Sequence, residues 1–240
     1  MEYSKLVNYF SSLFKTEPSS VNDFFSMLKN MCSGSATSLS IFFLTLLFSI
    51  PLALFIAMGK MSKNKILSQI TNVFLLIIRG TPLMLQLLVV YFVPKLIATK
   101  CFNKIIQWPS YVAAIVAFSI NYAAYFAEIY RGGIESIPKG QYEAAKVLGY
   151  SSVQTFFKIV LPQVIKRIVP AMGNEVITLV KDTSLVTILS VPELMYYAKS
   201  SANRMVSFTP LLIAGVFYFL MNWVVSTAFR KLEKKLSYYS

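Results

Sequence analysis

The feature that most constrains this chain is a series of long apolar segments, two of them without a single charge. Ala36–Met58 gives 23 uncharged residues and Val206–Phe229 gives 24. A helix needs about 20 apolar residues to cross the hydrocarbon core of a bilayer. Tyr111–Ala127 is a shorter uncharged run, while Ile66–Pro94 and Met172–Val191 are apolar segments interrupted by charges. We therefore expect an all-α integral membrane protein with about five transmembrane helices.

The composition agrees with a chain whose solvent is lipid. Hydrophobic residues make up 56% and charged residues 14%, against about 25% charged in typical soluble domains. The net charge of +13 indicates basic cytoplasmic loops rather than nucleic-acid binding, because the chain is a membrane protein. No histidine is present, so we expect no catalytic residue and no metal site. The two cysteines, Cys32 and Cys101, either pair or remain free thiols.

The basic residues predict the orientation in the membrane. Five spans place the two termini on opposite sides. One side would receive 13 Lys and Arg residues, from the loop after the first span, the long loop after the third span and the carboxyl-terminal tail, and the other side would receive 8. Cytoplasmic loops carry the excess of Lys and Arg. We expect the long loop and the C-terminus to be cytoplasmic and the N-terminus to be outside.

The expected organisation has three parts. An extracellular or interfacial segment (1–32) precedes a transmembrane domain (33–230) that contains the long loop (132–170), and a cytoplasmic tail (231–240) follows. The first thirty residues lack a basic start followed by an apolar run, so no cleaved signal peptide is expected. The start of the first span is left open, because apolar residues before Ala36 could extend it. Residues that could face an interfacial helix are Leu6, Phe10, Leu13 and Phe14.

The long loop has the pattern of two short helices. Gln141–Leu148 is rich in good helix formers. Gly149 suits the left-handed position that closes such a helix. Ser151, with Gln154 three residues later, is typical of a capping box that opens a second helix. The sequence therefore predicts a helix, a glycine stop and another helix in the polar loop.

Two prolines and a group of small residues complete this loop. Pro162 and Pro170 would end the second helical segment. The small side chains of Ala144 and Ala145 would let another backbone approach closely, and Glu143 offers a carboxylate to a partner. A docking element for another protein is one interpretation, and an ordinary surface helical hairpin is the other.

Four motifs in order along the chain resemble one family. Their residues are Arg79-Gly80-Thr81-Pro82-Leu83, then Asn121–Tyr125 with Glu128–Ile134, then Glu143-Ala144-Ala145 with Gly149, Ile159, Leu161 and Pro162, and finally Lys181–Leu185. Together they resemble the permeases of ABC importers, in the subfamily that takes up polar amino acids of the histidine, glutamine, arginine and opine type. The resemblance runs from about Phe24 to about Leu236.

This resemblance implies a type I importer in a bacterial cytoplasmic membrane. Two permease subunits, as a homodimer or a heterodimer, would form the pathway in the lipid. A dimer of cytoplasmic ATPases would drive them, and an extracellular binding protein would deliver a polar amino acid. The chain has no G-x-x-x-x-G-K-[ST] phosphate loop, so the ATPase would bind ATP and Mg and this chain would not be an enzyme. The residues implied in ATPase coupling are Glu143, Ala144, Ala145, Gly149, Ile159, Leu161 and Pro162.

Other interpretations stay open at this point. The same importer type could carry cystine, another sulfur amino acid or an opine. A channel or a membrane scaffold protein is more distant, because neither needs a cytoplasmic docking loop.

Polar residues within the spans are candidates for a solute site. Charges at this depth cost at least a few kcal/mol each unless they face a cavity or a partner. Asn121 and Tyr125 share one helix face, and Glu175 and Asp182 share another, by their spacing. The candidate substrate-lining residues are Asn121, Tyr125, Glu175, Lys181, Asp182 and Ser184. The alternative is a purely structural network between helices, for instance Arg79 with Asp182.

The segment Ile66–Pro94 has 29 residues, longer than a single perpendicular span requires. It is either tilted, or it starts along the cytoplasmic interface and breaks near Gly80–Pro82. In the second case Arg79, Gly80 and Pro82 would have a structural or gating role.

Overall fold

The structure is a computed structural model that describes residues 21–104 and 108–236. The described residues form helices joined by short connections, and no strand occurs among them. Four helices are long and apolar enough to cross a membrane: α2 (Val21–Lys60), α4 (Leu83–Phe102), α5 (Ser110–Glu135) and α10 (Thr209–Leu236). The interfacial helix expected around Leu6–Phe14 and the last residues of the tail lie outside the described residues.

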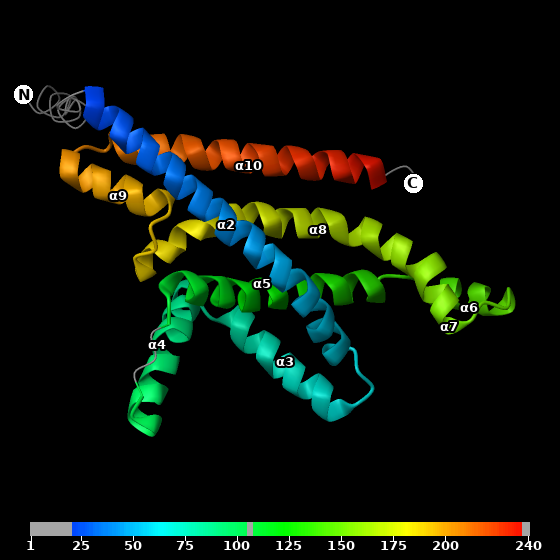
Figure 1. The fold of residues 1–240 in the computed structure, drawn as a ribbon. Coiled ribbons are helices and arrows are strands. Elements are labelled where there is room, and N and C mark those ends of the chain that lie inside the picture. The colour runs from blue at the N-terminus through cyan, green and yellow to red at the C-terminus, as the bar shows by residue number, and fades with distance from the viewer. Residues whose placement is uncertain (1–20, 105–107, 237–240) are drawn as a thin grey trace, which may run out of the picture.

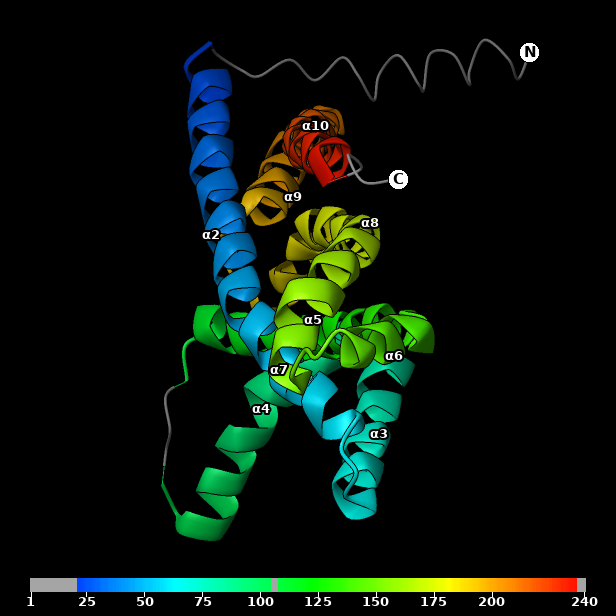
Figure 2. The same ribbon diagram turned by 90° about the vertical axis from the view of Figure 1, so that its right-hand side faces the viewer.

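α5 lies at the centre of the packing. α2 and α8 (Leu161–Asp182) both pack against α5. α10 packs on α8 (Figures 1 and 2). The central part of α5 is lined by small residues such as Ala117, Ala123 and Ala124, which are fully buried. Small side chains let neighbouring helix backbones approach closely within a membrane. The most buried segment of the chain is therefore the one that carries Asn121.

α2 extends further outward than the uncharged run predicts. It begins at Val21 and has 40 residues, so the boundary expected at residue 32 falls inside this helix. The added turns bury Met27 and Met31 in a cluster with Leu194 of α9 (Leu194–Met205). Tertiary packing thus continues the helix beyond its apolar core. Cys32 and Cys101 are both free and exposed.

The segment 66–94 breaks as one of the two alternatives predicted. α3 (Lys65–Gly80) ends just before Thr81, which is extended, and Pro82 precedes the first residue of α4. A residue before proline is driven out of the α conformation. The expected end at Pro94 is wrong, because α4 continues through it to Phe102. In Figure 2, α3 and α4 diverge from each other below α5.

The expected helices of the long loop are present. α6 (Lys139–Val147) is followed by Gly149 at φ +77°. α7 (Ser152–Thr155) opens with the full capping box, because the Ser151 hydroxyl accepts from the Gln154 N–H and the Gln154 side chain accepts from the Ser151 N–H. The local sequence signals therefore determine this part of the chain.

The predicted proline stops are wrong. α7 continues without interruption through a π-helical turn (Phe156–Val160) into α8. Pro162 lies inside this continuous helix, directly after the π-helical turn, where the bonding pattern already changes because the Leu161 N–H bonds the Phe156 carbonyl five residues back. Pro170 lies inside α8, whose other residues hold the helix together by packing. One continuous helical rod therefore joins the loop to the membrane core.

The expected fourth span, Met172–Val191, is also wrong in its bounds. α8 ends at Asp182 and a 3₁₀ helix, η2 (Thr183–Leu189), follows. The Thr183 hydroxyl donates to the Val180 carbonyl at 2.8 Å, and the Ser184 hydroxyl donates to the Lys181 carbonyl at 2.8 Å. Hydroxyl groups that bind nearby carbonyls offer the backbone an alternative to the α-helical ladder. The polar residues at which α8 ends include Asp182, which also lines the cavity described below.

Candidate functional site

A cavity of about 250 Å³ lies where α5, α8 and the break between α3 and α4 meet. Its lining residues are Thr81, Leu83, Asn121, Tyr122, Tyr125, Glu175, Thr178 and Asp182. Four of the six candidate substrate-lining residues are therefore brought together. Lys181 and Ser184 are not among those that line it, and the Lys181 side chain is exposed.

Helical spacing explains how two elements supply this lining. Asn121 and Tyr125 are one turn apart on α5, and Glu175 and Asp182 are two turns apart on α8. The Tyr122 hydroxyl donates to the Asp182 carboxylate at 2.7 Å. Glu175 is half-buried and makes no hydrogen bond or ion pair with the described residues. One carboxylate of the cavity is thus held by a hydrogen bond, and the other makes none with the described residues, although the Arg79 guanidinium attracts it at longer range.

Two features of the site were not predicted as site residues. Tyr122 is 1% exposed, and its aromatic character gave no signal beyond core packing. Gln86 of α4 lies behind the lining, where its side-chain oxygen accepts from the Asn121 amide at 2.9 Å. Gln86 lies three residues after the motif that ends at Leu83, but the sequence cannot show that it meets Asn121, 35 residues further along the chain.

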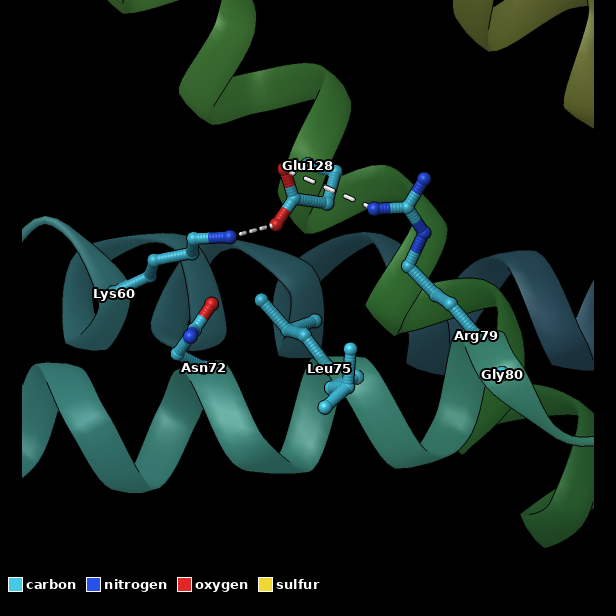
Figure 3. A pocket seen from close by; sticks show the side chains of 7 residues that line it. Lys60, Asn72, Leu75, Arg79, Gly80 and Glu128 are labelled. Carbon is cyan, nitrogen blue, oxygen red and sulfur yellow. Dashed lines mark hydrogen bonds and ion pairs between the residues drawn. The ribbon is translucent and has the colours of Figure 1, made fainter.

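A charge cluster lies beside a second cavity, of about 260 Å³, and it replaces the expected pairing of Arg79 with Asp182 (Figure 3). Its centre is Glu128 of α5, which pairs with Lys60 at the end of α2 and with Arg131 at 2.7 Å. Arg79 approaches the same carboxylate at 3.9 Å, and its guanidinium lies 5.4 Å from the centre of the Tyr125 ring. The cluster ties α2, α3 and α5 together, so Arg79 takes part in a structural network with a different partner.

A fourth carboxylate is buried outside both cavities. Glu193 is 0% exposed. Its Oε1 accepts from the Thr187 hydroxyl at 2.6 Å and from the Tyr196 N–H at 2.8 Å, and its Oε2 accepts from the hydroxyl groups of Ser38 and Tyr218 at 3.2 and 2.9 Å. These donors come from α2, η2, α9 and α10. Glu193 is a structural hub that sequence reasoning missed.

The predicted coupling residues fall on the projecting loop. Glu143 and Ala144 lie exposed on α6, whereas Ala145 is buried against the rest of the loop. Gly149 is exposed in its left-handed turn. Ile159 lies in the π-helical turn, and Leu161 and Pro162 begin α8. All seven residues belong to one compact structure at the end of the molecule (Figure 1).

This loop has an apolar outer surface and a packed inner side. Val147, Leu148, Val153 and Phe157 are each more than 60% exposed. On the inner side, a small cluster centred on Ile137, Val160 and Val164 joins the end of α5 to the start of α8. Several large apolar side chains exposed on one short loop outside the membrane-spanning helices are a candidate protein contact. The inner cluster therefore joins the loop to the two helices that line the cavity.

These features define a class of protein. A chain with long apolar helices, an acidic cavity among them and a projecting polar loop is typical of the membrane part of a transporter. The comparison with family models identifies it. Residues 49–238 match the model described as "Binding-protein-dependent transport system inner membrane component", and the chain belongs to this family. It is a permease subunit of an ABC importer, which works with a separate ATPase and a binding protein.

Named relatives agree along most of the chain. It is 32% identical over 205 residues to a putative glutamine transport system permease protein of Rickettsia conorii, covering 85% of this chain and 91% of the relative. It is 35% identical to the arginine transport system permease protein of Bacillus subtilis (85% and 90%). It is 34% identical to the nopaline transport system permease protein of Agrobacterium fabrum (79% and 80%).

Solved structures confirm the fold. The crystal structure of an amino acid ABC transporter with histidines matches with a TM-score of 0.79 and 31% identity, covering 91% of this chain and 100% of that chain. An inward-facing structure of a methionine ABC transporter matches with a TM-score of 0.70 at 18% identity, over 88% and 98% of the two chains. The second likeness concerns the fold alone.

Proposed function

We propose that this permease translocates a polar amino acid and that the cavity between α5 and α8 holds the solute on its way. The observation that carries the proposal is the meeting of Asn121, Tyr125, Glu175 and Asp182 in one cavity among membrane helices. A carboxylate binds the ammonium group of an amino acid, and a tyrosine hydroxyl can donate to its carboxylate. Glu175 is open to such a ligand, since no described residue pairs with it.

The names of the relatives support the class of solute. They are named as putative glutamine, arginine and nopaline transport system permeases, and the structural match at 31% identity is an amino acid ABC transporter. An opine is the second candidate, favoured by the similarity to the nopaline permease. We regard cystine and other sulfur amino acids as weaker candidates.

The coupling loop, 132–170, is proposed to transmit the conformational change of the ATPase to the membrane helices. In this account, α6 lies in a groove of the ATPase, with Glu143, Ala144 and the exposed apolar residues at the contact. ATP and Mg²⁺ bind in the ATPase. Closure of the ATPase dimer would move the rod that starts at α7 and so shift Glu175 and Asp182, because α7 and α8 are continuous.

The proposed assembly places the docking loop in the cytoplasm of a bacterial cell. The carboxyl ends of α2, α5 and α10 lie toward the same end of the molecule as α6 and α7 (Figure 1), and the predominance of basic residues there supports that side as cytoplasmic. The N-terminus would then be outside, near the binding protein. A second permease, identical or related, would complete the pathway, and lipid would cover the remaining exposed apolar faces.

ATP hydrolysis by the reconstituted complex tests the solute site. The permease, its ATPase and its binding protein would be placed in liposomes and challenged with the twenty amino acids, cystine and an opine. We expect stimulation by a few polar amino acids, and we expect Asp182→Ala to lose it. Stimulation that survives Asp182→Ala would contradict the claim that the cavity holds the solute. No stimulation by any of these solutes would contradict the proposed function.

A charge reversal on the loop tests the coupling role. Glu143→Lys should prevent the ATPase from copurifying with the permease, because it puts a cation at the contact. Glu233→Lys makes the same change near the end of α10, at the same end of the molecule, and should leave copurification intact. Equal copurification in the two variants would contradict a contact at Glu143.

A further inference from the structure

The cavity of about 260 Å³ beside Glu128 carries an excess of positive charge. Its lining includes Lys60 and Arg79 but only one carboxylate, that of Glu128. Arg131 joins the cluster from α5, where it pairs with Glu128 and with Glu135. Three basic and two acidic side chains therefore leave a net charge of +1. An unbalanced charge among membrane helices is costly, and one monovalent anion would balance this one.

Arg79 has unused donors for such an anion. A guanidinium carries five N–H groups, yet that of Arg79 makes no hydrogen bond with the described residues. Its Nη1 lies 3.9 Å from the Glu128 carboxylate, which is longer than a hydrogen bond. Its other contacts are the Tyr125 ring, at 5.4 Å, and the attraction of Glu175 at longer range. The side chain is 44% exposed, so its donors are open to a ligand.

Helical spacing places a second donor beside Arg79. Asn72 lies two turns before it on α3, and both line the cavity. Figure 3 shows the two side chains on the same side of α3, the side that faces Lys60 and Glu128. The Asn72 amide is exposed and makes no hydrogen bond with the described residues. An amide can donate to an oxyanion, and a guanidinium can bind a phosphate through two parallel hydrogen bonds.

The surface around the cavity indicates where the anion comes from. Leu76 lines the cavity and is 73% exposed. Val73 and Ile77, its neighbours on α3, are 46% and 54% exposed. The charged lining is therefore bordered by apolar side chains that are open to the surroundings of a membrane helix. A soluble anion would use the donors alone, whereas a lipid would also cover these apolar side chains.

The depth of the cavity agrees with a lipid headgroup. Lys60 is the last residue of α2, and Lys63 and Lys65 follow it in the connection to α3. Basic residues at the end of a span lie at the level of the lipid phosphates. Basic pockets between membrane helices bind anionic headgroups.

We propose that this cavity binds the phosphate group of an anionic phospholipid from the leaflet on the side of the coupling loop. Arg79, Asn72 and Lys60 would donate to the phosphate, and the acyl chains would lie on the exposed apolar residues of α3. A phosphatidylglycerol carries the single negative charge that the cluster requires. Phosphatidylcholine adds an ammonium group, which the basic lining would repel. The inference goes beyond the transport of a solute and does not depend on which solute is carried.

A competition experiment tests this lipid site. The permease–ATPase complex would be purified in a neutral detergent, and binding of phosphatidylglycerol with a fluorescent acyl chain would be followed by fluorescence anisotropy. Unlabelled phosphatidylglycerol, phosphatidylcholine and glycerol phosphate would then compete with the label. We expect phosphatidylglycerol to displace it at a concentration about tenfold or more below that of phosphatidylcholine, the value of one charged hydrogen bond. Glycerol phosphate should not displace it over the same range.

Variants locate the site. Arg79→Gln should remove most of the preference for phosphatidylglycerol. Arg230→Gln is the matched control, because it removes one exposed arginine of α10 near the same end of the molecule, and it should keep the preference. If Arg79→Gln does not assemble with the ATPase, Asn72→Leu on the exposed side of α3 takes its place. That variant should weaken the binding of phosphatidylglycerol by roughly threefold or more.

Different results would overturn different parts of the inference. Equal displacement by phosphatidylcholine would overturn the recognition of an anionic lipid. Displacement by glycerol phosphate over the same range would assign the cavity to a soluble phosphate and overturn the lipid. An unchanged preference in Arg79→Gln, or unchanged binding in Asn72→Leu where it is used instead, would overturn the location. An equal loss in Arg230→Gln would show a diffuse attraction to the basic end of the chain, which also overturns it.

Discussion

The buried and half-buried carboxylates of the helical bundle have three different environments. Glu193 is enclosed by four donors, and Glu128 is surrounded by basic side chains. Glu175 and Asp182 instead face a cavity. A carboxylate that is fully satisfied by its own protein stabilises the fold, whereas one that faces a cavity is available for a ligand. This difference separates the structural acids from the site.

Glu193→Gln should destabilise the permease. A glutamine keeps one acceptor oxygen and replaces the other with an NH₂ group, which cannot accept. Two of the four donors therefore lose their acceptor at a site that is 0% exposed. We expect a loss of roughly 1–3 kcal/mol in the free energy of unfolding. Thermal unfolding of the purified protein measures it, with Glu233→Gln as the control on α10. An unchanged midpoint for Glu193→Gln would contradict the structural role.

At the residue scale the sequence predicted residues that line the cavity better than it predicted the residues behind the lining. Asn121, Tyr125, Glu175 and Asp182 could be found because a polar residue within an apolar span is costly unless it faces a cavity or a partner. Lys181 and Ser184 were included for the same reason, yet the end of α8 turns them away from the cavity lining. Gln86 could not be assigned its role, since its partners are determined by packing between separate helices.

The helices show where local signals decide and where packing overrides them. The α6 stop at Gly149 and the capping box at Ser151 follow from turn and cap chemistry, and the α3–α4 break follows from Pro82. Pro162 and Pro170 were expected to end a helix, but the first directly follows the π-helical turn and the second lies inside α8, and the helix continues through both. The long loop is consequently joined to the cavity by a continuous helix, which its prolines did not predict.

Gly133 tests how closely that junction is packed. A Cβ atom at this position would lie 2.3 Å from Cγ2 of Ile168 and 3.3 Å from Cγ1 of Val164. Gly133→Ala should therefore separate α5 from α8 at the base of the loop and cost about 1–3 kcal/mol of stability. The neighbouring Gly132 has open space, so Gly132→Ala should be neutral or slightly stabilising. Thermal unfolding of both variants decides the matter, and equal midpoints would contradict the close packing.

The whole molecule has two ends with different chemistry. One end carries the docking loop and the carboxyl ends of α2, α5 and α10, and α9 lies toward the other end (Figure 1). The sequence predicted this division from its basic residues. The angles between α3, α4 and α5 could not be predicted, because they depend on the pairings of Glu128 and Gln86 rather than on any local pattern.

The sidedness predicts a labelling pattern. In cells that carry Cys32→Ser, the exposed thiol of Cys101 should react with a maleimide that does not cross membranes. In a cysteine-free chain with Ser152→Cys, the loop thiol should react after the cells are opened and not before. The reverse pattern would place the docking loop outside the cell and contradict the orientation.

Uptake of a labelled amino acid tests the central claim most directly. The complex with its ATPase and binding protein would be placed in liposomes, and accumulation would be compared for the natural chain and for Glu175→Gln, which preserves size and removes one charge from the cavity. The account predicts ATP-dependent accumulation by the natural chain and a loss of roughly tenfold or more in Glu175→Gln, with the ATPase still bound. Full accumulation by Glu175→Gln would show that the solute does not depend on this cavity.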